Sequence, residues 1–238
     1  MRNVFICIIS LLITGCSVRW ADKIAEKGFD KECINQYSKA MKIYNRGISL
    51  NKRSAELYWR RGNLYARNDN HKMAIIDLTK SIEIDSLFNG GYAYWDRAIS
   101  KEELKDTLGA LSDYNKAILR SPEQGNFYCY RGILKYRMAD YKNALNDFDN
   151  AIKYWENFYL ARSYRSTLRV KMEDYSGALE DFNYMNLDKE DKSDALEFRY
   201  RGIAKFETHD TIGACNDWKI AANHMDSISI EKIKLYCK

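Results

Sequence analysis

Oppositely charged side chains recur along this chain at one fixed spacing. In five places an arginine is followed sixteen residues later by an aspartate: Arg61 and Asp77, Arg97 and Asp113, Arg131 and Asp147, Arg165 and Asp181, and Arg201 and Asp217. Such groups either form a row of catalytic or ligand-binding charges, or each arginine binds its aspartate in a structural ion pair. Arginine suits the second role because its planar guanidinium donates two parallel hydrogen bonds to a carboxylate. We therefore predict five structural ion pairs.

No other combination of reactive residues forms a recognisable site in the sequence. The three histidines, His71, His209 and His224, do not pair at helical spacing. There is no GxSxG, HExxH or phosphate-binding glycine loop, and neither CxxC nor a series of Cys and His pairs at zinc spacing. We therefore expect no catalytic residue, no metal site and no cofactor, and we do not expect an enzyme.

A sixfold repeat predicts the elements that carry these charges. A small residue recurs at steps of 34, 36, 34, 34 and 36 residues: Gly28, Gly62, Ala98, Gly132, Ser166 and Gly202. Twelve residues after each stands an alanine: Ala40, Ala74, Ala110, Ala144, Ala178 and Ala214. Four residues further stands a bulky side chain: Tyr44, Leu78, Tyr114, Phe148, Phe182 and Trp218. Such a period indicates stacked helical hairpins. Small residues let the two helices of a hairpin approach closely, and the bulky residues are expected to fill the space between hairpins.

The repeats resemble tetratricopeptide repeats. Residues 130–135 read YRGILK and 144–148 read ALNDF, and the last unit repeats this as YRGIAK at 200–205 and ACNDW at 214–218. The resemblance implies an all-α fold, a tetratricopeptide-type α-solenoid of about six helical hairpins with a C-terminal capping helix. We place the repeats at 21–54, 55–90, 91–124, 125–158, 159–194 and 195–228, and the capping helix at 229–238. Within each antiparallel hairpin the arginine and its aspartate are nearly equidistant from the turn, so they are expected to meet.

The first residues have the pattern of an export signal. A basic start, Met1 to Asn3, precedes an apolar run from Val4 to Thr14, which is too short to span a bilayer as a helix. The segment ends Ile13-Thr14-Gly15-Cys16, which resembles a bacterial lipobox. The resemblance implies a signal peptide over 1–15, lipidation of Cys16 by acyl chains such as palmitate, and a lipid-anchored tether over 16–20. Ser17 implies transport to the outer membrane, facing the periplasm.

The distribution of charge along the sequence argues against nucleic-acid binding. The net charge is +5, but lysines and arginines are interspersed with acidic residues, whereas nucleic-acid binders concentrate them in a basic run or stripe. We therefore expect no nucleic-acid partner.

An exported protein is able to pair its cysteines, and Cys215 is placed to meet Cys237 on the capping helix. The sequence leaves that pairing open.

The family resemblance implies a partner-binding groove lined by the first helix of each hairpin. By register the groove residues are Trp59, Asn63, Arg67, Tyr92, Trp95, Ile99, Ile133, Tyr136, Arg137, Thr167, Lys171, Arg199 and Phe206. Trp59 and Trp95 occupy equivalent places and are expected to stand side by side in the groove, unless they pack between hairpins.

The function expected from this arrangement is a membrane-anchored protein-protein interaction scaffold of the bacterial cell envelope, which binds a peptide or protein ligand. The layout of six repeats behind a lipobox resembles lipoproteins that assist pilus assembly. An alternative is a substrate-holding accessory subunit of a secreted or surface enzyme system.

Overall fold

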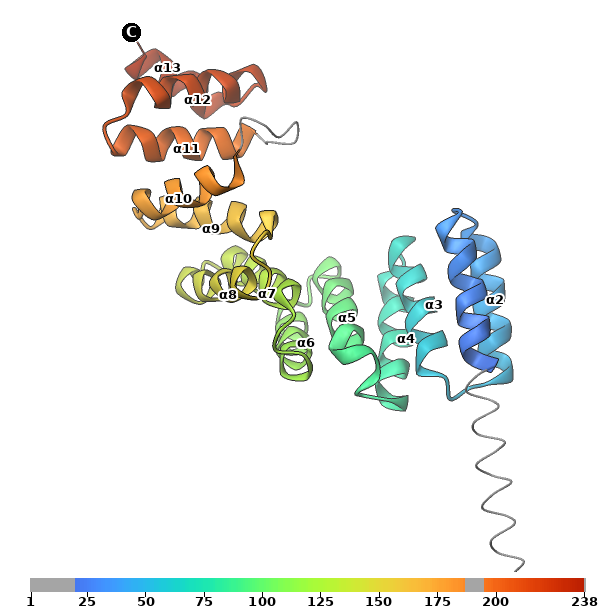
Figure 1. Cartoon of the computed structure of the whole chain (residues 1–238). Coiled ribbons are helices and arrows are strands. Elements are labelled where there is room, and N and C mark those ends of the chain that lie inside the picture. The colour runs from blue at the N-terminus through green and yellow to red at the C-terminus, as the bar shows by residue number, and fades with distance from the viewer. Residues whose placement is uncertain (1–19, 187–194, 238) are drawn as a thin grey trace, which may run out of the picture. The chain divides into compact units, whose positions relative to one another are not determined.

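The computed structural model describes residues 20–186 and 195–237, which are helical with short connections. The predicted signal peptide and the lipidated Cys16 lie outside the described residues. The contacts divide the chain into two compact units, and the division falls between Pro122 and Glu123. Pro122 is the only proline of the chain. Figure 1 shows the hairpins of each unit following one another in chain order.

Unit 1 contains the first three hairpins. Its helical elements are residues 20–33, α2 (Tyr37–Leu50), α3 (Ala55–Arg67), α4 (His71–Ile84), the short 3-10 helix η1 (Phe88–Gly91), α5 (Tyr92–Glu103) and α6 (Thr107–Arg120). In η1 the backbone passes through left-handed conformations at Asn89 and Gly90 before α5 begins. Asparagine and glycine adopt this conformation most readily.

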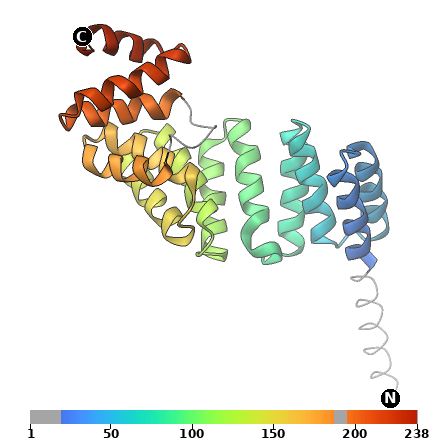
Figure 2. The ribbon, with the colours of Figure 1, turned by 45° about the horizontal axis from the view of Figure 1, so that its top comes forward.

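Unit 2 contains the other three hairpins and the last helix. Its elements are α7 (Gly125–Arg137), α8 (Tyr141–Tyr154), α9 (Tyr159–Lys171), α10 (Tyr175–Met185), α11 (Ala195–Glu207), α12 (Thr211–Asn223) and α13 (Ser227–Tyr236). The all-α fold with tetratricopeptide-type hairpins, which the sequence predicted, is confirmed. Figure 2 shows the same elements after a rotation.

The turns inside the hairpins share one local structure. Two residues before each second helix, the backbone adopts a positive φ: Asn35, Asp69, Lys105, Ala139, Glu173 and His209. The next residue caps the second helix, and in four hairpins its side chain accepts a backbone N–H three residues on: Asn70, Asp106, Asp174 and Asp210. Such caps satisfy helix N–H groups that otherwise lack a partner. The turn therefore ends one helix and begins the next within three residues.

The repeated small residues face the repeated bulky residues. A Cβ added to Gly132 would lie 2.8 Å from the Phe148 ring, and one added to Gly202 would lie 2.5 Å from the Trp218 indole. Both distances are shorter than van der Waals contact, so the rings occupy the space that a side chain would need. The bulky residues thus pack inside their own hairpins, and Phe148 also stacks on Tyr164 of the next hairpin, with ring centroids 5.8 Å apart.

The last helix covers the end of unit 2. Asp226 caps α13 by accepting the backbone N–H of Ser229, so the helix begins two residues before the predicted position. Tyr236 packs on Phe206, with ring centroids 4.5 Å apart. Cys215 of α12 and Cys237 form a disulfide. Within 20–186 and 195–237, none of the helices combines the length and the apolar character that crossing a bilayer requires.

Candidate functional site

The five arginine–aspartate pairs join the two helices of their hairpins. Each guanidinium donates through Nε and Nη2 to the two carboxylate oxygens, at distances from 2.5 Å (Arg165 to Asp181) to 2.9 Å (Arg131 to Asp147). The aspartate side chains are at most 2 % exposed. Because these carboxylates are buried and held from two sides, a ligand does not reach them. They are structural groups.

A second cation, missed by the sequence analysis, joins four of these pairs. One helical turn after the arginine, Lys101, Lys135, Arg169 and Lys205 contact the same aspartates at 2.7–3.0 Å. Burial alone would raise the pKa of Asp113, but hydrogen bonds from Arg97 and Lys101 outweigh it and hold the pKa below its usual value. The signal was present in the sequence as a basic residue four positions after each of these arginines.

We call the surface formed by the first helices of one unit its first-helix face. In unit 1 a carboxylate that the sequence analysis missed, Asp96 of α5, organises this face. Its Oδ2 accepts the indole Nε1–H of Trp59 at 2.6 Å and the amide Nδ2–H of Asn63 at 3.1 Å, both from α3. Burial raises the pKa of Asp96 to about 6, against the lowering effect of these two hydrogen bonds and of Arg67.

The other predicted groove residues of unit 1 also contact groups of their own unit. The Trp59 ring packs edge-on against Phe88 at 5.9 Å, and the Trp95 ring packs edge-on against Tyr92 at 5.8 Å. Arg67 donates to Glu32 at 2.9 Å. Ile99 is half-buried. Hydrogen bonds within the unit thus engage the polar groups of Trp59, Asn63 and Arg67.

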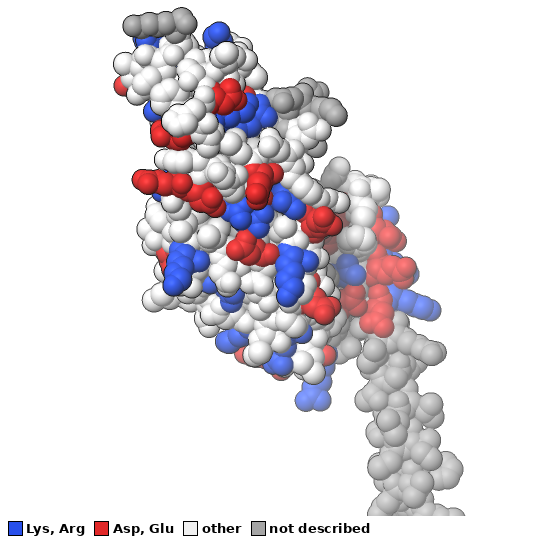
Figure 3. Space-filling model, turned by 60° about the vertical axis from the view of Figure 1, so that its left-hand side comes forward, with Lys and Arg blue, Asp and Glu red and all other residues white. Residues whose placement is uncertain are grey.

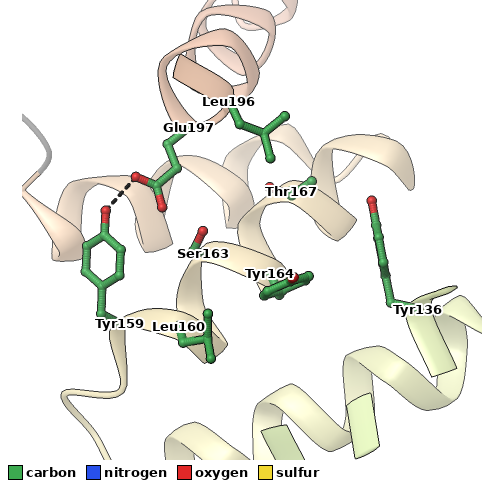
Figure 4. A pocket seen from close by; sticks show the side chains of 8 residues that line it. All are labelled: Tyr136, Tyr159, Leu160, Ser163, Tyr164, Thr167, Leu196 and Glu197. Carbon is green, nitrogen blue, oxygen red and sulfur yellow. Dashed lines mark hydrogen bonds between the residues drawn. The ribbon is translucent and has the colours of Figure 1, made fainter. Parts of the chain in front are cut away.

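The first-helix face of unit 2 holds a cavity of about 450 Å³ between α7, α9 and α11. Figure 4 shows the residues that line it: Tyr136, Tyr159, Leu160, Ser163, Tyr164, Thr167, Leu196 and Glu197. The Tyr136 and Tyr164 rings meet edge to face, with centroids 5.9 Å apart and planes at 79°. Across the cavity, the Tyr159 hydroxyl donates to Glu197 Oε2 at 2.5 Å. The cavity combines aromatic and aliphatic walls with hydroxyls and one carboxylate.

The structure brings two predicted groove residues, Tyr136 and Thr167, to this cavity. Lys171 lies near it, with Nζ 5.9 Å from the centroid of the Tyr136 ring, and Arg137 is exposed. The six other lining residues were missed, although the helix period points to Leu160 and Ser163, which precede Thr167 by two turns and one turn on the same face of α9.

Three predicted groove residues of unit 2 do not line the cavity, and the prediction was wrong for Ile133. Ile133 is buried in the core with Phe148, because α7 turns this side chain toward its own hairpin. Phe206 packs on Trp218 and beneath Tyr236, because α13 covers that side of α11. Arg199 donates to Asp226, the cap of α13, at 2.8 Å. Its guanidinium therefore joins α11 to the start of α13.

On the face drawn in Figure 3 the charges do not gather by sign. Figure 3 shows lysines and arginines interspersed with acidic side chains on the face that it presents. The described residues contain no cluster of His, Cys, Asp or Glu suited to holding a metal ion. Within residues 20–186 and 195–237, two cysteines lie outside the disulfide: Cys33 is exposed and Cys129 is buried.

Comparison with known proteins points to one type of repeat. The family model for the tetratricopeptide repeat matches residues 55–86. Serine/threonine-protein phosphatase 5 of Homo sapiens and of Rattus norvegicus is 29% identical over 106 residues, which is 44% of this chain. The match spans only about a fifth (21%) of the length of these relatives.

Solved structures extend the likeness over most of the chain. The structure of pilF from Pseudomonas aeruginosa matches with a TM-score of 0.80 at 13% identity, over 92% of this chain and 98% of that one. YrrB, described as a TPR protein with an unusual peptide-binding site, matches with a TM-score of 0.67 at 20% identity, over 80% and 97%. MamA matches with a TM-score of 0.61 at 16% identity, over 67% and 92%. At these identities the likeness concerns the fold.

Proposed function

We propose, given that the chain is a tetratricopeptide repeat protein, that it is an interaction scaffold which binds a partner peptide or an extended loop of a partner protein. The observation that carries the proposal is the cavity of unit 2. Its volume of about 450 Å³ falls within the range of about 300–1,000 Å³ that is common for ligand sites. Such sites combine apolar walls with a few placed polar groups, and this cavity has both.

The scaffold is proposed to work at a membrane of the bacterial cell envelope. The lipobox-like segment ending at Cys16 motivates this, because two or more acyl chains anchor a protein stably. The disulfide between Cys215 and Cys237 supports an exported location, since disulfides persist in oxidising compartments. From Ser17 we infer the outer membrane, with the repeats in the periplasm. Labelled palmitate should enter the wild type and not a Cys16→Ser variant, and equal labelling would refute the anchor.

The binding proposal is tested by crosslinked co-purification from native membranes. The wild type is compared with a Tyr136→Ala/Tyr164→Ala variant, which removes the aromatic walls of the cavity, and with a Trp59→Ala/Trp95→Ala variant on the face of unit 1. We expect one partner to be retained by the wild type and by the unit 1 variant, and lost from the unit 2 variant while helical circular dichroism persists. Retention of the partner by all three proteins would place the interface elsewhere.

A further inference from the structure

The walls of the cavity of unit 2 are mostly apolar. The Tyr164 ring is stacked by one face on Phe148 at 5.8 Å and meets the Tyr136 ring nearly at a right angle. Figure 4 shows Leu196 of α11 above these rings and Leu160 of α9 beside Tyr164. Leu160 and Leu196 are 36 % and 43 % exposed, so both present apolar surface to water at the cavity. An apolar side chain that enters the cavity removes these surfaces from water together with its own.

The carboxylate in the lining lies at one side and is engaged by its own unit. The Tyr159 hydroxyl donates to Glu197 Oε2 at 2.5 Å, and Figure 4 shows this pair on the opposite side of the cavity from Tyr136. Between these sides the lining consists of the Tyr164 ring, leucine side chains and the hydroxyls of Ser163 and Thr167. The part of the cavity next to Tyr136 therefore suits an uncharged apolar side chain.

A cation stands just beyond the Tyr136 wall. Lys171 is exposed at the end of α9, and its Nζ lies 5.9 Å from the centroid of the Tyr136 ring. The phenols of Tyr200 and Tyr136 raise the pKa of Lys171 above its usual value, so the ammonium is charged at neutral pH. By contrast, Lys135 and Lys205 bind aspartates of their own hairpins. Lys171 therefore offers a positive charge to a ligand at the surface.

The distance between the apolar cavity and this cation sets the spacing of a ligand. The Tyr136 ring centroid lies 5.9 Å from that of Tyr164 and 5.9 Å from Lys171 Nζ. In an extended peptide, side chains that point the same way are two residues apart, which is about 7 Å. An extended peptide therefore places one side chain in the cavity and the side chain two residues away at Lys171, with the Tyr136 ring between them.

We propose that the first-helix face of unit 2 binds an extended partner peptide through a bulky apolar side chain in the cavity, with an acidic side chain two residues away against Lys171. This inference rests on the proposed function, because it names the ligand chemistry of the same cavity. The apolar residue supplies most of the affinity, since burying a whole leucine or phenylalanine side chain is worth about tenfold to a hundredfold. An exposed ion pair is worth at most about fivefold, and it sets which peptides are preferred.

The test selects ligands from a displayed library of random nine-residue peptides on the immobilised protein. The selected peptides are resynthesised with the apolar residue changed to alanine, or with the acidic residue changed to its amide or to lysine. Affinities are measured for the wild type, Leu196→Asn and Lys171→Glu. The matched control variants are Ile212→Asn and Lys219→Glu, at exposed positions of α12 that are outside the cavity lining. Circular dichroism checks that each variant is folded, and the altered peptides probe the same contacts with an unchanged protein.

We expect the selected peptides to share a bulky apolar residue two positions from an aspartate or glutamate. Alanine in place of the apolar residue should weaken binding to the wild type by at least about tenfold. Leu196→Asn should also weaken binding, and Ile212→Asn should not. The amide in place of the acidic residue should weaken binding to the wild type by about two- to fivefold. Lys171→Glu should prefer the lysine version to the acidic version, which reverses the wild-type order, whereas Lys219→Glu should keep that order.

The possible outcomes separate the two proposals. Selected peptides that share no apolar residue, or that bind as tightly with alanine in its place, overturn this inference and leave the peptide-binding function standing. An acidic residue whose change to lysine affects the wild type and Lys171→Glu equally does the same. Failure to select any peptide above a blank surface overturns both.

Discussion

The first-helix faces of the two units carry the same kind of contact and put it to different uses. In each, an aromatic donor from one first helix bonds a carboxylate of the next first helix: Trp59 to Asp96 in unit 1, and Tyr159 to Glu197 in unit 2. In unit 1 Asn63 binds the same carboxylate oxygen, so the unit's own groups occupy the carboxylate. In unit 2 the carboxylate lines a cavity.

One position of the repeat accounts for much of this difference. Asp96 and Tyr164 both stand directly before the arginine of their hairpins, Arg97 and Arg165. A carboxylate at this position attracts donors from the neighbouring helix, whereas a ring at the same position builds a wall. The buried ion pairs are thus common to both units and stabilise the hairpins of each. Single residues on the first helices decide whether the polar groups of a face bind one another or line a cavity.

The largest expected effect concerns the shared scaffold. Asp181 in unit 2 is contacted by Arg162, Arg165 and Arg169, so Asp181→Ala leaves several buried guanidinium groups without their anion. We expect the free energy of unfolding to fall by about 3–5 kcal/mol, the usual cost of breaking a buried ion pair. Chemical denaturation followed by circular dichroism measures it.

The matched substitution in unit 1 is Asp77→Ala. Asp77 binds Arg61, whose side chain is 17 % exposed and also donates to Asn45. The loss should be smaller than for Asp181→Ala. Equal losses would show that the number of cations around the aspartate does not matter, and the scaffold argument would then have to be changed.

The sequence was sufficient to predict the hairpins and the ion pairs, because both depend on residues that recur in every repeat. Gly132 and Phe148 meet through helix geometry that is the same in each hairpin. The faces were harder to predict, since they depend on how far each helix is rotated and on which neighbour covers it. Ile133 and Tyr136 are three residues apart on α7, yet one is in the core and the other lines the cavity. The packing of Phe206 on Tyr236 of α13 was missed because it is a contact at the end of the unit. Such a contact does not recur in the other repeats, so the repeat pattern does not show it.

Asp96 is a residue whose departure from the repeat is visible in the sequence but whose contacts are not. It is a single acidic residue at a position that three other hairpins fill with tyrosine, namely Tyr130, Tyr164 and Tyr200. A departure from the repeat is visible in the sequence, but its partners on α3 are not. Only the packing of α3 against α5 shows that Trp59 and Asn63 converge on this carboxylate.

The second prediction concerns Asp96, the buried carboxylate on the first-helix face of unit 1, whose charged form is destabilised by burial. Burial raises the pKa of Asp96 from its usual 3.8 to about 6, so the folded protein binds this proton more tightly than the unfolded chain. The resulting stabilisation is complete below about pH 4 and is lost as the pH rises through about 6. At pH 7.5, Asp96→Asn should therefore stabilise the protein, by at most about 3 kcal/mol for a shift of two pKa units.

The measurement is the melting temperature of the wild type and of Asp96→Asn between pH 4 and pH 8. Subtracting the two curves removes the contribution of other groups such as Asp113, whose lowered pKa gives the opposite slope. We expect the difference in favour of the variant to grow from pH 4 to pH 7. A flat difference would mean that Asp96 is solvated like a surface carboxylate.

A third prediction concerns the corresponding contact in unit 2. Tyr159→Phe removes the hydroxyl that donates to Glu197 and keeps the ring. We expect a loss of about 1.5 kcal/mol, at the low end for hydrogen bonds to charged groups, measured by chemical denaturation. An unchanged free energy of unfolding would mean that this hydroxyl does not help to hold Glu197 in place.

The smallest effect is expected at a carboxylate that shares its arginine with a buried one. Arg165 donates to Asp149 at 2.7 Å as well as to Asp181, but the Asp149 side chain is 50 % exposed. Once Asp149 is removed, Arg165 keeps its two hydrogen bonds to Asp181, and exposed pairs contribute about 0–1 kcal/mol. Asp149→Ala should therefore change the free energy of unfolding by less than about 1 kcal/mol, against the much larger loss for Asp181→Ala. Since one guanidinium serves both aspartates, a comparable loss for the two variants would mean that burial of the carboxylate is not what makes the repeated ion pairs strong.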